Sequence, residues 1–400
     1  MTQSAADAAS GRAVRAADRA HLANVETQIL ELERSLSSLK EEKEAIRDRL
    51  AIYTYPVLTL PNEIVSQIFV HFLPAFPHYP PPIGLLSPYL LCQICQKWRD
   101  IALATPALWS VISLSFHKAG RVPQKLHYLQ TSIERSGSCR LSLKLATRLD
   151  DSYLAELVHM VIDHFRRVEY LDLSHWPAFG FPTDAELSLP FLRGLKLGDY
   201  FNAPVTRIMA PVLQQVVLQD FGGLDNSFFP WSQLTAITVE WIRLDGYSYL
   251  INQLVNVVYC NLGLCATDQL SLQDVTLSHL ETFILRIFLG NHLPPGSGIM
   301  ATLTLPALRR LQITETLLAG EDDPVNSIAS LVTRSGCNLR ELSIPDASTA
   351  HERYRDTFPS TSITSEALDS DIIVPFLMEW EDEDEESSDS DDEFDADSED

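Results

Sequence analysis

One recurrent apolar spacing constrains the fold of this 400-residue chain more than any other feature. An apolar residue is followed by two residues, a second apolar residue, one residue and a third apolar residue. Each copy alternates near its end, as a half-buried strand does, so the spacing predicts a row of strands. The copies are Ser138-Leu141-Leu143 (the weakest), Val168-Leu171-Leu173, Leu192-Leu195-Leu197, Leu213-Val216-Leu218, Leu234-Ile237-Val239, Leu254-Val257-Tyr259, Leu280-Phe283-Leu285, Leu308-Leu311-Ile313 and Leu339-Leu342-Ile344.

The intervals between copies resemble those of leucine-rich repeats, which recur about every 20–29 residues. Helical patterns in the longer spacers, beginning at Asp151 and at Pro324, support strand-and-helix units. The predicted fold is therefore α+β, with an irregular leucine-rich-repeat-like α/β solenoid over residues 111–350 and a C-terminal cap or linker over residues 351–378. The alternative is an unrelated β-rich domain in which the leucine spacing arose by chance.

In such a solenoid, the residues that alternate with the buried apolar positions face the concave side, where stacked repeats bind other proteins. These side chains are mixed in charge, which favours a protein or peptide target. The predicted target-binding residues are Tyr170, Asp172, Lys196, Gln215, Gln219, Glu240, Arg286, Arg310, Gln312 and Glu341.

A small helical module is predicted over residues 57–110. Pro61 suits the first position of a helix whose apolar face includes Ile64, Val65, Ile68 and Phe69. A proline-rich gap follows over residues 74–88. A second helix is predicted to begin with Ser87 as its cap and Pro88 at its first position, and its apolar stripe is Leu91, Ile94, Cys95, Trp98, Ile101 and Ala102.

The ordered pattern LPxEIxxxIF, gap, CxxWRxxAxxxPxLW resembles an F-box, in the divergent form common in fungi. The resemblance implies a module that docks on a Skp-type adaptor and, through it, on a cullin. The proline-rich gap departs from the family pattern. The alternative is a helical hairpin that fills its own core. Matched position by position, the implied adaptor-binding residues are Leu60, Pro61, Ile64, Ile68, Phe69, Trp98 and Ile101.

A heptad seam precedes the module. Residues 21–55 are predicted to form a coiled coil, and residues 1–20 to be disordered or, as the alternative, a frayed helix. The seam could join two copies of the chain as a homodimer through residues 25–50, or belong to one amphipathic helix folded back on its own protein. Its members are Val25, Ile29, Leu32, Leu36, Leu39, Lys43, Ile46 and Leu50.

Several function classes lack support in the sequence. The net charge of −24 and the absence of a basic stripe argue against nucleic-acid binding. No apolar run is long enough to suggest a membrane span. Cys92 and Cys95 form an isolated CxxC pair without the second pair that zinc would require. No catalytic residues, cofactor or metal are predicted, and the six cysteines fit a reducing cytoplasmic or nuclear environment.

The chain ends in an acidic tail, residues 379–400, which is predicted to be disordered. Ser388 and Ser390 each precede an acidic residue by three positions, so both are candidate phosphorylation sites for acidophilic kinases. The alternative is a passive, solubilising tail.

Together these features predict a non-enzymatic, substrate-recognition subunit of an SCF-type cullin-RING ubiquitin ligase. The module would bind the adaptor, and the repeats would bind an unknown protein substrate for ubiquitin-dependent degradation. The alternative is an F-box protein outside any ligase, or a coiled-coil scaffold that mediates protein assembly.

Overall fold

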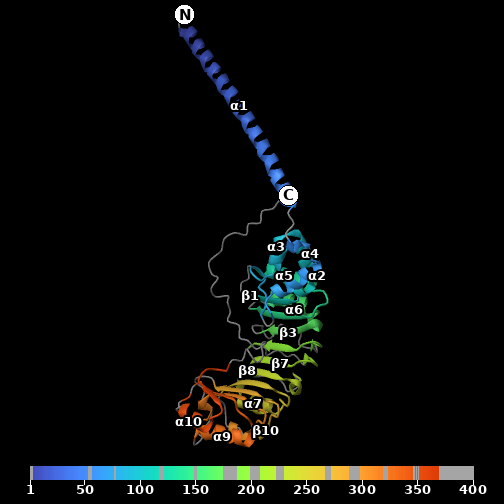
Figure 1. Ribbon diagram of the computed structural model, residues 1–400, viewed down its shortest axis with the longest axis vertical. Coiled ribbons are helices and arrows are strands. Elements are labelled where there is room, and N and C mark those ends of the chain that lie inside the picture. Colours follow the sequence, from blue (N-terminus) through green and yellow to red (C-terminus); the bar gives the residue numbers. More distant parts are fainter. Residues whose placement is uncertain are drawn as a thin grey trace. The chain divides into compact units, whose positions relative to one another are not determined.

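A computed structural model gives the fold of the chain (Figure 1). Its contacts divide the chain into two compact units, Met1–Val65 and Ser66–Asp400. The structure describes residues 3–52, 56–75, 78–116, 121–147, 151–173, 187–198, 208–221, 229–265, 272–287, 298–318, 323–345, 347, 349 and 351–368.

The first unit is dominated by one long helix, α1 (Gln3–Ile52), followed by the short 3₁₀ helix η1 (Pro56–Thr59). Of the two alternatives for residues 1–20, disordered chain or frayed helix, α1 corresponds to the helical one, since it begins at Gln3. Alanine is the strongest helix former, and this stretch is rich in it.

The helical module begins with α2 (Asn62–Phe72), at the position predicted after Pro61. The carbonyl oxygen of Pro61 accepts hydrogen bonds from the backbone amides of Ile64 and Val65, both at 3.1 Å. Ser87 caps α3 (Pro88–Ile94) as predicted, because its hydroxyl oxygen accepts a hydrogen bond of 3.2 Å from the amide of Tyr89.

The second predicted helix is divided in two, which the apolar stripe did not predict. Cys95 is extended, with φ −159° and ψ 166°, and it separates α3 from α4 (Gln96–Leu103). The Nε of Arg99 donates a hydrogen bond of 2.8 Å to the carbonyl oxygen of Cys92, which the break leaves without a helical partner. The 3₁₀ helix η2 (Pro106–Trp109) then leads into the sheet.

The central element is an eleven-stranded sheet in which the strands follow one another in chain order and every pair is parallel. The described part of the chain is thus a mixed helix-and-strand fold around a large parallel sheet (Figure 1). The strands are β1 (Val111–Phe116), β2 (Leu141–Thr147), β3 (Val168–Leu173), β5 (Gly194–Leu197), β7 (Gln215–Asp220), β8 (Ala236–Arg243), β9 (Tyr259–Cys265), β11 (Thr282–Ile287), β13 (Arg310–Ile313), β14 (Glu341–Ser343) and β15 (Ser362–Thr364).

Helices and short strands fill the connections. The helices predicted at Asp151 and Pro324 are present as α6 (Asp151–Ile162) and α9 (Pro324–Ser335), and Gly336 ends α9 in the left-handed conformation with φ 59°. The other elements are α5 (Val122–Arg135), η4 (Phe165–Arg167), β4 (Leu187–Ser188), β6 (Ile208–Met209), η6 (Trp231–Gln233), α7 (Leu244–Ile251), β10 (Val275–Thr276), α8 (Ile299–Thr302), β12 (Leu303–Thr304), η7 (Glu315–Leu318) and α10 (His351–Thr357).

The recurrent apolar residues form the main core on one face of the sheet. Leu171, Leu195 and Val216 are paired in register across β3, β5 and β7, and each is at most 1% exposed. Leu129 of α5 and Ile328 of α9 belong to the same core. We call the opposite face of the sheet, away from this core, the outer face.

One repeat was assigned to the wrong register. The sequence predicted Leu254-Val257-Tyr259, but Cys260 and Leu262 pair with Ile237 and Val239, so the repeat begins three residues later, at Val257. Tyr259 therefore lies on the outer face. Leu254 is also buried in the core, which explains why it satisfied the pattern.

The sheet also extends beyond the predicted copies at both ends. β1 precedes the weakest copy, and β15 pairs with β14 after residue 350, where only a cap or linker was predicted. The predicted tail, residues 379–400, with Ser388 and Ser390, lies outside the described residues.

Candidate protein-interaction surfaces

Helix α2 has one buried and one exposed apolar face. Val65 and Phe69 are each 1% exposed, whereas Ile64 and Ile68 are each 49% exposed. Residues four apart share a helix face, so two isoleucines form a pair exposed to solvent. An amphipathic helix of a monomeric protein normally buries its apolar side chains, and this second apolar face is therefore a candidate docking surface.

The other predicted adaptor-binding residues divide between surface and core. Pro61 is exposed and Leu60 is half-buried. Phe69 lies edge-on to Trp98, with ring centroids 4.9 Å apart, and Ile101 is 6% exposed. A partner that docks on the module in this conformation would contact the Ile64 and Ile68 face, while Phe69 and Ile101 support that face from within.

The proline-rich gap carries further exposed apolar side chains. Ile83 is 71% exposed and Leu85 is 76% exposed. Leu86 has a positive φ of 65°, a conformation that L-residues rarely adopt. Sequence reasoning treated this gap as a plain loop and did not assign a binding role to these residues.

Tyr79 of the same gap lies near outer-face residues of β3. Burial raises the pKa of the Tyr79 hydroxyl, and the nearby Asp172 and Tyr170 raise that pKa further. Asp172 and Tyr170 belong to β3, so the Tyr79 hydroxyl is buried close to the outer face at this strand. Asp172, predicted to contact a target, is only 4% exposed.

The ten predicted target-binding residues all alternate with core positions and so lie on the outer face. Lys196 is paired in register with Asp172, and Arg310 forms an ion pair of 2.7 Å with Glu341. Gln312 is buried, at 4% exposed. The half-buried members of the set are Tyr170, Lys196, Gln215, Gln219, Glu240, Arg286, Arg310 and Glu341.

A second hydrophobic cluster lies on the outer face, and sequence reasoning missed it. It consists of Val217, Ala236, Tyr259, Ile284 and Leu368. The first four stand on the neighbouring strands β7, β8, β9 and β11, and we call them the outer-face apolar row. The sequence does contain these apolar residues at strand positions that face outward. The predicted target-binding residues, however, were chosen for their polar groups.

The C-terminal segment after β15 turns back across this face. The hydroxyl of Ser343 donates a hydrogen bond of 2.6 Å to the carbonyl oxygen of Glu366. The backbone amide of Leu368 then donates a hydrogen bond of 2.7 Å to the side-chain oxygen of Gln312. Burial of Gln312 thus follows from its role as an anchor for the chain's own backbone.

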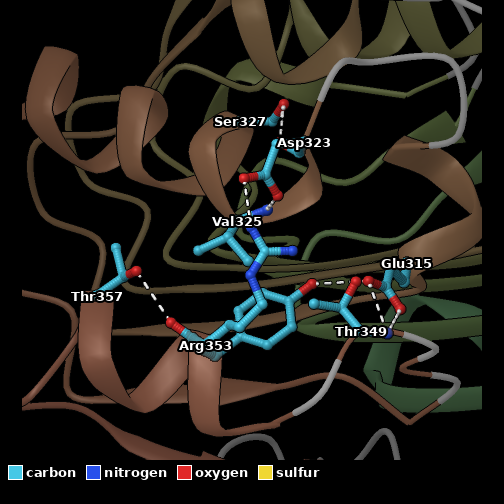
Figure 2. A network of polar contacts seen from close by, with 8 residues as sticks. Glu315, Asp323, Val325, Ser327, Thr349, Arg353 and Thr357 are labelled. Atoms are coloured by element: carbon cyan, nitrogen blue, oxygen red, sulfur yellow. Dashed lines mark hydrogen bonds and ion pairs between the residues drawn. The ribbon is translucent and has the colours of Figure 1, made fainter.

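A polar network holds the last strands and helices together (Figure 2). The buried carboxylate of Glu315 accepts hydrogen bonds from the amide of Thr349, at 3.0 Å, and from the hydroxyl of Tyr354, also at 3.0 Å. Asp323 accepts from the amide of Val325, which caps α9, and pairs with Arg353 at 2.7 Å. This network positions β15 and the segment that follows it.

Two further kinds of site, metal centres and membrane-spanning helices, are absent from the described residues. No group of three or more His, Cys, Asp or Glu side chains within them could hold a metal ion. No described helix is long and apolar enough to cross a membrane. Cys92 and Cys95 are free thiols, as are the other four cysteines.

Comparison with known proteins gives little further information. No family model matches the chain, and no curated protein matches it. A solved structure described as the "crystal structure of Rad7 and Elc1 complex in yeast" aligns over 78% of this chain and 92% of its own chain, with 13% identity and a TM-score of 0.30. A similarity at this TM-score is too low to establish a common fold.

Proposed function

We propose that this protein is a substrate-recognition subunit of an SCF-type cullin-RING ubiquitin ligase. In this proposal the helical module is an F-box that docks on a Skp-type adaptor, and the strand array is a leucine-rich-repeat solenoid that binds the substrate. The observation that carries the proposal is the second apolar face of α2, where Ile64 and Ile68 remain exposed beside a complete module core.

The proposed mechanism requires no chemistry from this chain. The module would hold the protein on the adaptor and thus on the cullin, and the array would hold the substrate near a ubiquitin-charged enzyme. The rate gain would come from effective concentration, since tethering makes the transfer step effectively intramolecular.

Co-purification with a Skp-type adaptor tests the proposal. Ile64→Asp combined with Ile68→Asp should abolish binding, because two charges would be placed at the centre of an apolar contact. The matched control is Val255→Asp with Val258→Asp, which changes two exposed valines of the array and should bind as wild type does. Failure of the wild-type chain to bind the adaptor would overturn the proposal.

A second candidate function, assembly through α1, is favoured by the exposure of the heptad seam. Leu32, Leu36 and Leu39 are 69%, 53% and 59% exposed, and Ile46 and Leu50 are exposed as well. The occupant that fits such a seam is an identical helix, because each copy supplies the same a and d positions. We propose that residues 25–50 form a homodimeric coiled coil.

Sedimentation velocity on the full chain tests this dimer. Leu36→Asp with Leu39→Asp should convert it to a monomer. Ser37→Asp with Ser38→Asp adds the same charge at positions off the seam and should leave the dimer intact. A wild-type chain that is monomeric at tens of micromolar would contradict the proposal.

A further inference from the structure

An open groove lies at the end of the sheet where the strands β8, β9, β11 and β13 begin. Its volume is about 560 Å³, which is within the range of small ligand sites. Neighbouring strands are about 4.8 Å apart, so the three steps from β8 to β13 give the groove a length of roughly 14 Å. The side chains that matter for its chemistry are Gln233, Thr235, Asn256, Val258, His279 and Glu281.

The two amide side chains of the groove direct their nitrogens at the protein's own backbone. The Nε2 of Gln233 donates hydrogen bonds to the carbonyl oxygens of Ala210, at 2.7 Å, and Leu213, at 2.9 Å. The Nδ2 of Asn256 donates a hydrogen bond of 2.7 Å to the carbonyl oxygen of Ser232. A carbonyl oxygen only accepts, so these bonds fix the orientation of both amides. The amide oxygens, which have no partner among the described residues, are left as acceptors.

Glu281 adds a negative charge to these acceptors. One oxygen of its carboxylate lies 3.6 Å from the Nη1 of Arg309, which is longer than a hydrogen bond. The other oxygen has no partner within the part of the chain that the structure describes. The backbone amide of Glu281 donates a hydrogen bond of 2.9 Å to the carbonyl oxygen of Val258, so the two residues are neighbours on adjacent strands. Val258 is 38% exposed and adds an apolar surface beside the charge.

A surplus of acceptors, one carboxylate and an apolar surface together match the side chain of arginine. Its aliphatic stem packs on apolar surface while its head group stays polar, which suits Val258. Its planar guanidinium carries five donors and no acceptor, which suits the oxygens of Glu281 and Asn256. The net charge of −24 also favours the approach of a basic partner and disfavours an anion.

We propose that this groove binds an arginine side chain from an extended basic segment of a partner protein. The inference deepens the proposed function and rests on it only in identifying that partner as the substrate. None of the ten predicted target-binding residues lines the groove, so the strand starts provide a contact site separate from the outer face.

Methyl NMR on the full chain, with labelled valine methyl groups, tests the proposal. The probe is N-acetyl-arginine amide, and the signals of Val258, assigned from their loss in Val258→Ala, should shift saturably as it is added. The citrulline analogue keeps the shape of arginine but lacks its charge, and it should bind at least about fivefold more weakly. The lysine analogue should also bind more weakly, because an ammonium has fewer donors.

Glu281→Gln should weaken binding of the arginine probe about fivefold. The matched control is Glu169→Gln. Glu169 forms the corresponding ion pair with Arg193, at 2.9 Å, in an earlier repeat, and its loss should leave binding unchanged. Thermal unfolding followed by circular dichroism checks that both variants are folded.

Four outcomes would overturn the proposal: no saturable shift of the Val258 signals, equal binding of the citrulline analogue, equal binding of the lysine analogue, or equal effects of Glu281→Gln and Glu169→Gln. Co-purification with the Skp-type adaptor depends on α2 and should be the same for Glu281→Gln and wild type. A failure of the groove is therefore distinct from a failure of the proposed function.

Discussion

The hydroxyl of Tyr354 in α10 donates a hydrogen bond of 3.0 Å to the carboxylate of Glu315, 39 residues earlier in the chain. Tyr354 is fully buried and Glu315 is 5% exposed, so the bond joins two groups that water does not reach. It links the connection after β13 to the helix that precedes β15. It thereby supports the geometry with which the C-terminal segment reaches the outer face.

Removal of this bond should destabilise the array. Tyr354→Phe leaves a buried carboxylate short of one donor, and a loss of about 1–3 kcal/mol in the free energy of unfolding is expected. Urea denaturation followed by circular dichroism measures it. Arg353→Ala, which removes an exposed ion pair with Asp323, is the control and should cost at most about 1 kcal/mol. Equal effects of the two changes would contradict the assigned role.

Stability should fall at alkaline pH because of buried tyrosines. Burial raises the pKa of Tyr128 to about 12, and burial also raises the pKa values of Tyr247 and Tyr354. An unfolded tyrosine titrates near pH 10. Above that pH the unfolded chain releases protons that the folded chain retains, so the stabilising contribution is complete below about pH 10 and is lost as pH rises through about 12.

Urea midpoints between pH 8 and pH 11 check this dependence. Tyr128→Phe removes one titrating group and should give a shallower loss of stability above pH 10 than wild type shows. Identical slopes for the two proteins would show that Tyr128 does not contribute.

Because α2 has a buried and an exposed face, substitutions at neighbouring positions should destabilise the module by very different amounts. Phe69→Ala removes a buried ring from its contact with Trp98 and should cost about 3–5 kcal/mol in the stability of the module. Ile68→Ala, one position earlier on the exposed face, should cost less than about 1 kcal/mol. Proteolytic protection of the module, measured as a function of urea, separates the two outcomes.

Thiol reactivity checks the corrected register of β9. Cys260 is fully buried, and burial raises the pKa of its thiol, so it should resist N-ethylmaleimide in the folded protein and react after denaturation. The half-buried Cys139 serves as the internal control and should react first. Rapid native labelling of Cys260 would instead favour the register predicted from Leu254.

Local sequence patterns were sufficient to predict where a helix begins or ends when one or two adjacent residues determine the backbone conformation there. Ser87 and Pro88 fixed the beginning of α3, and Gly336 fixed the end of α9, because a cap and a left-handed residue act within one turn. The pattern failed at Cys95, where the helix breaks although the apolar stripe continues. Arg99 satisfies the freed carbonyl there, and a contact of this kind has no periodic signature.

The register of the repeat that contains β9 also could not be predicted from a local pattern. Leu254 and Val257 are both buried, so both fitted the apolar spacing, and only the pairing of Cys260 with Ile237 decides between them. The same holds for the binding surfaces. Ile64 and Phe69 both belong to the predicted adaptor-binding set, yet packing against Trp98 buries Phe69 and leaves Ile64 exposed.

Three properties could be predicted from the amino-acid sequence: strands recur, one side of each strand is apolar, and a helical module precedes them. These properties follow from the alternation and spacing of side chains, which are local. The contacts on the outer face, by contrast, follow only from tertiary packing. The hydrogen bond from Leu368 to Gln312 joins segments 56 residues apart in the chain, and its stability depends on burial that no local pattern records.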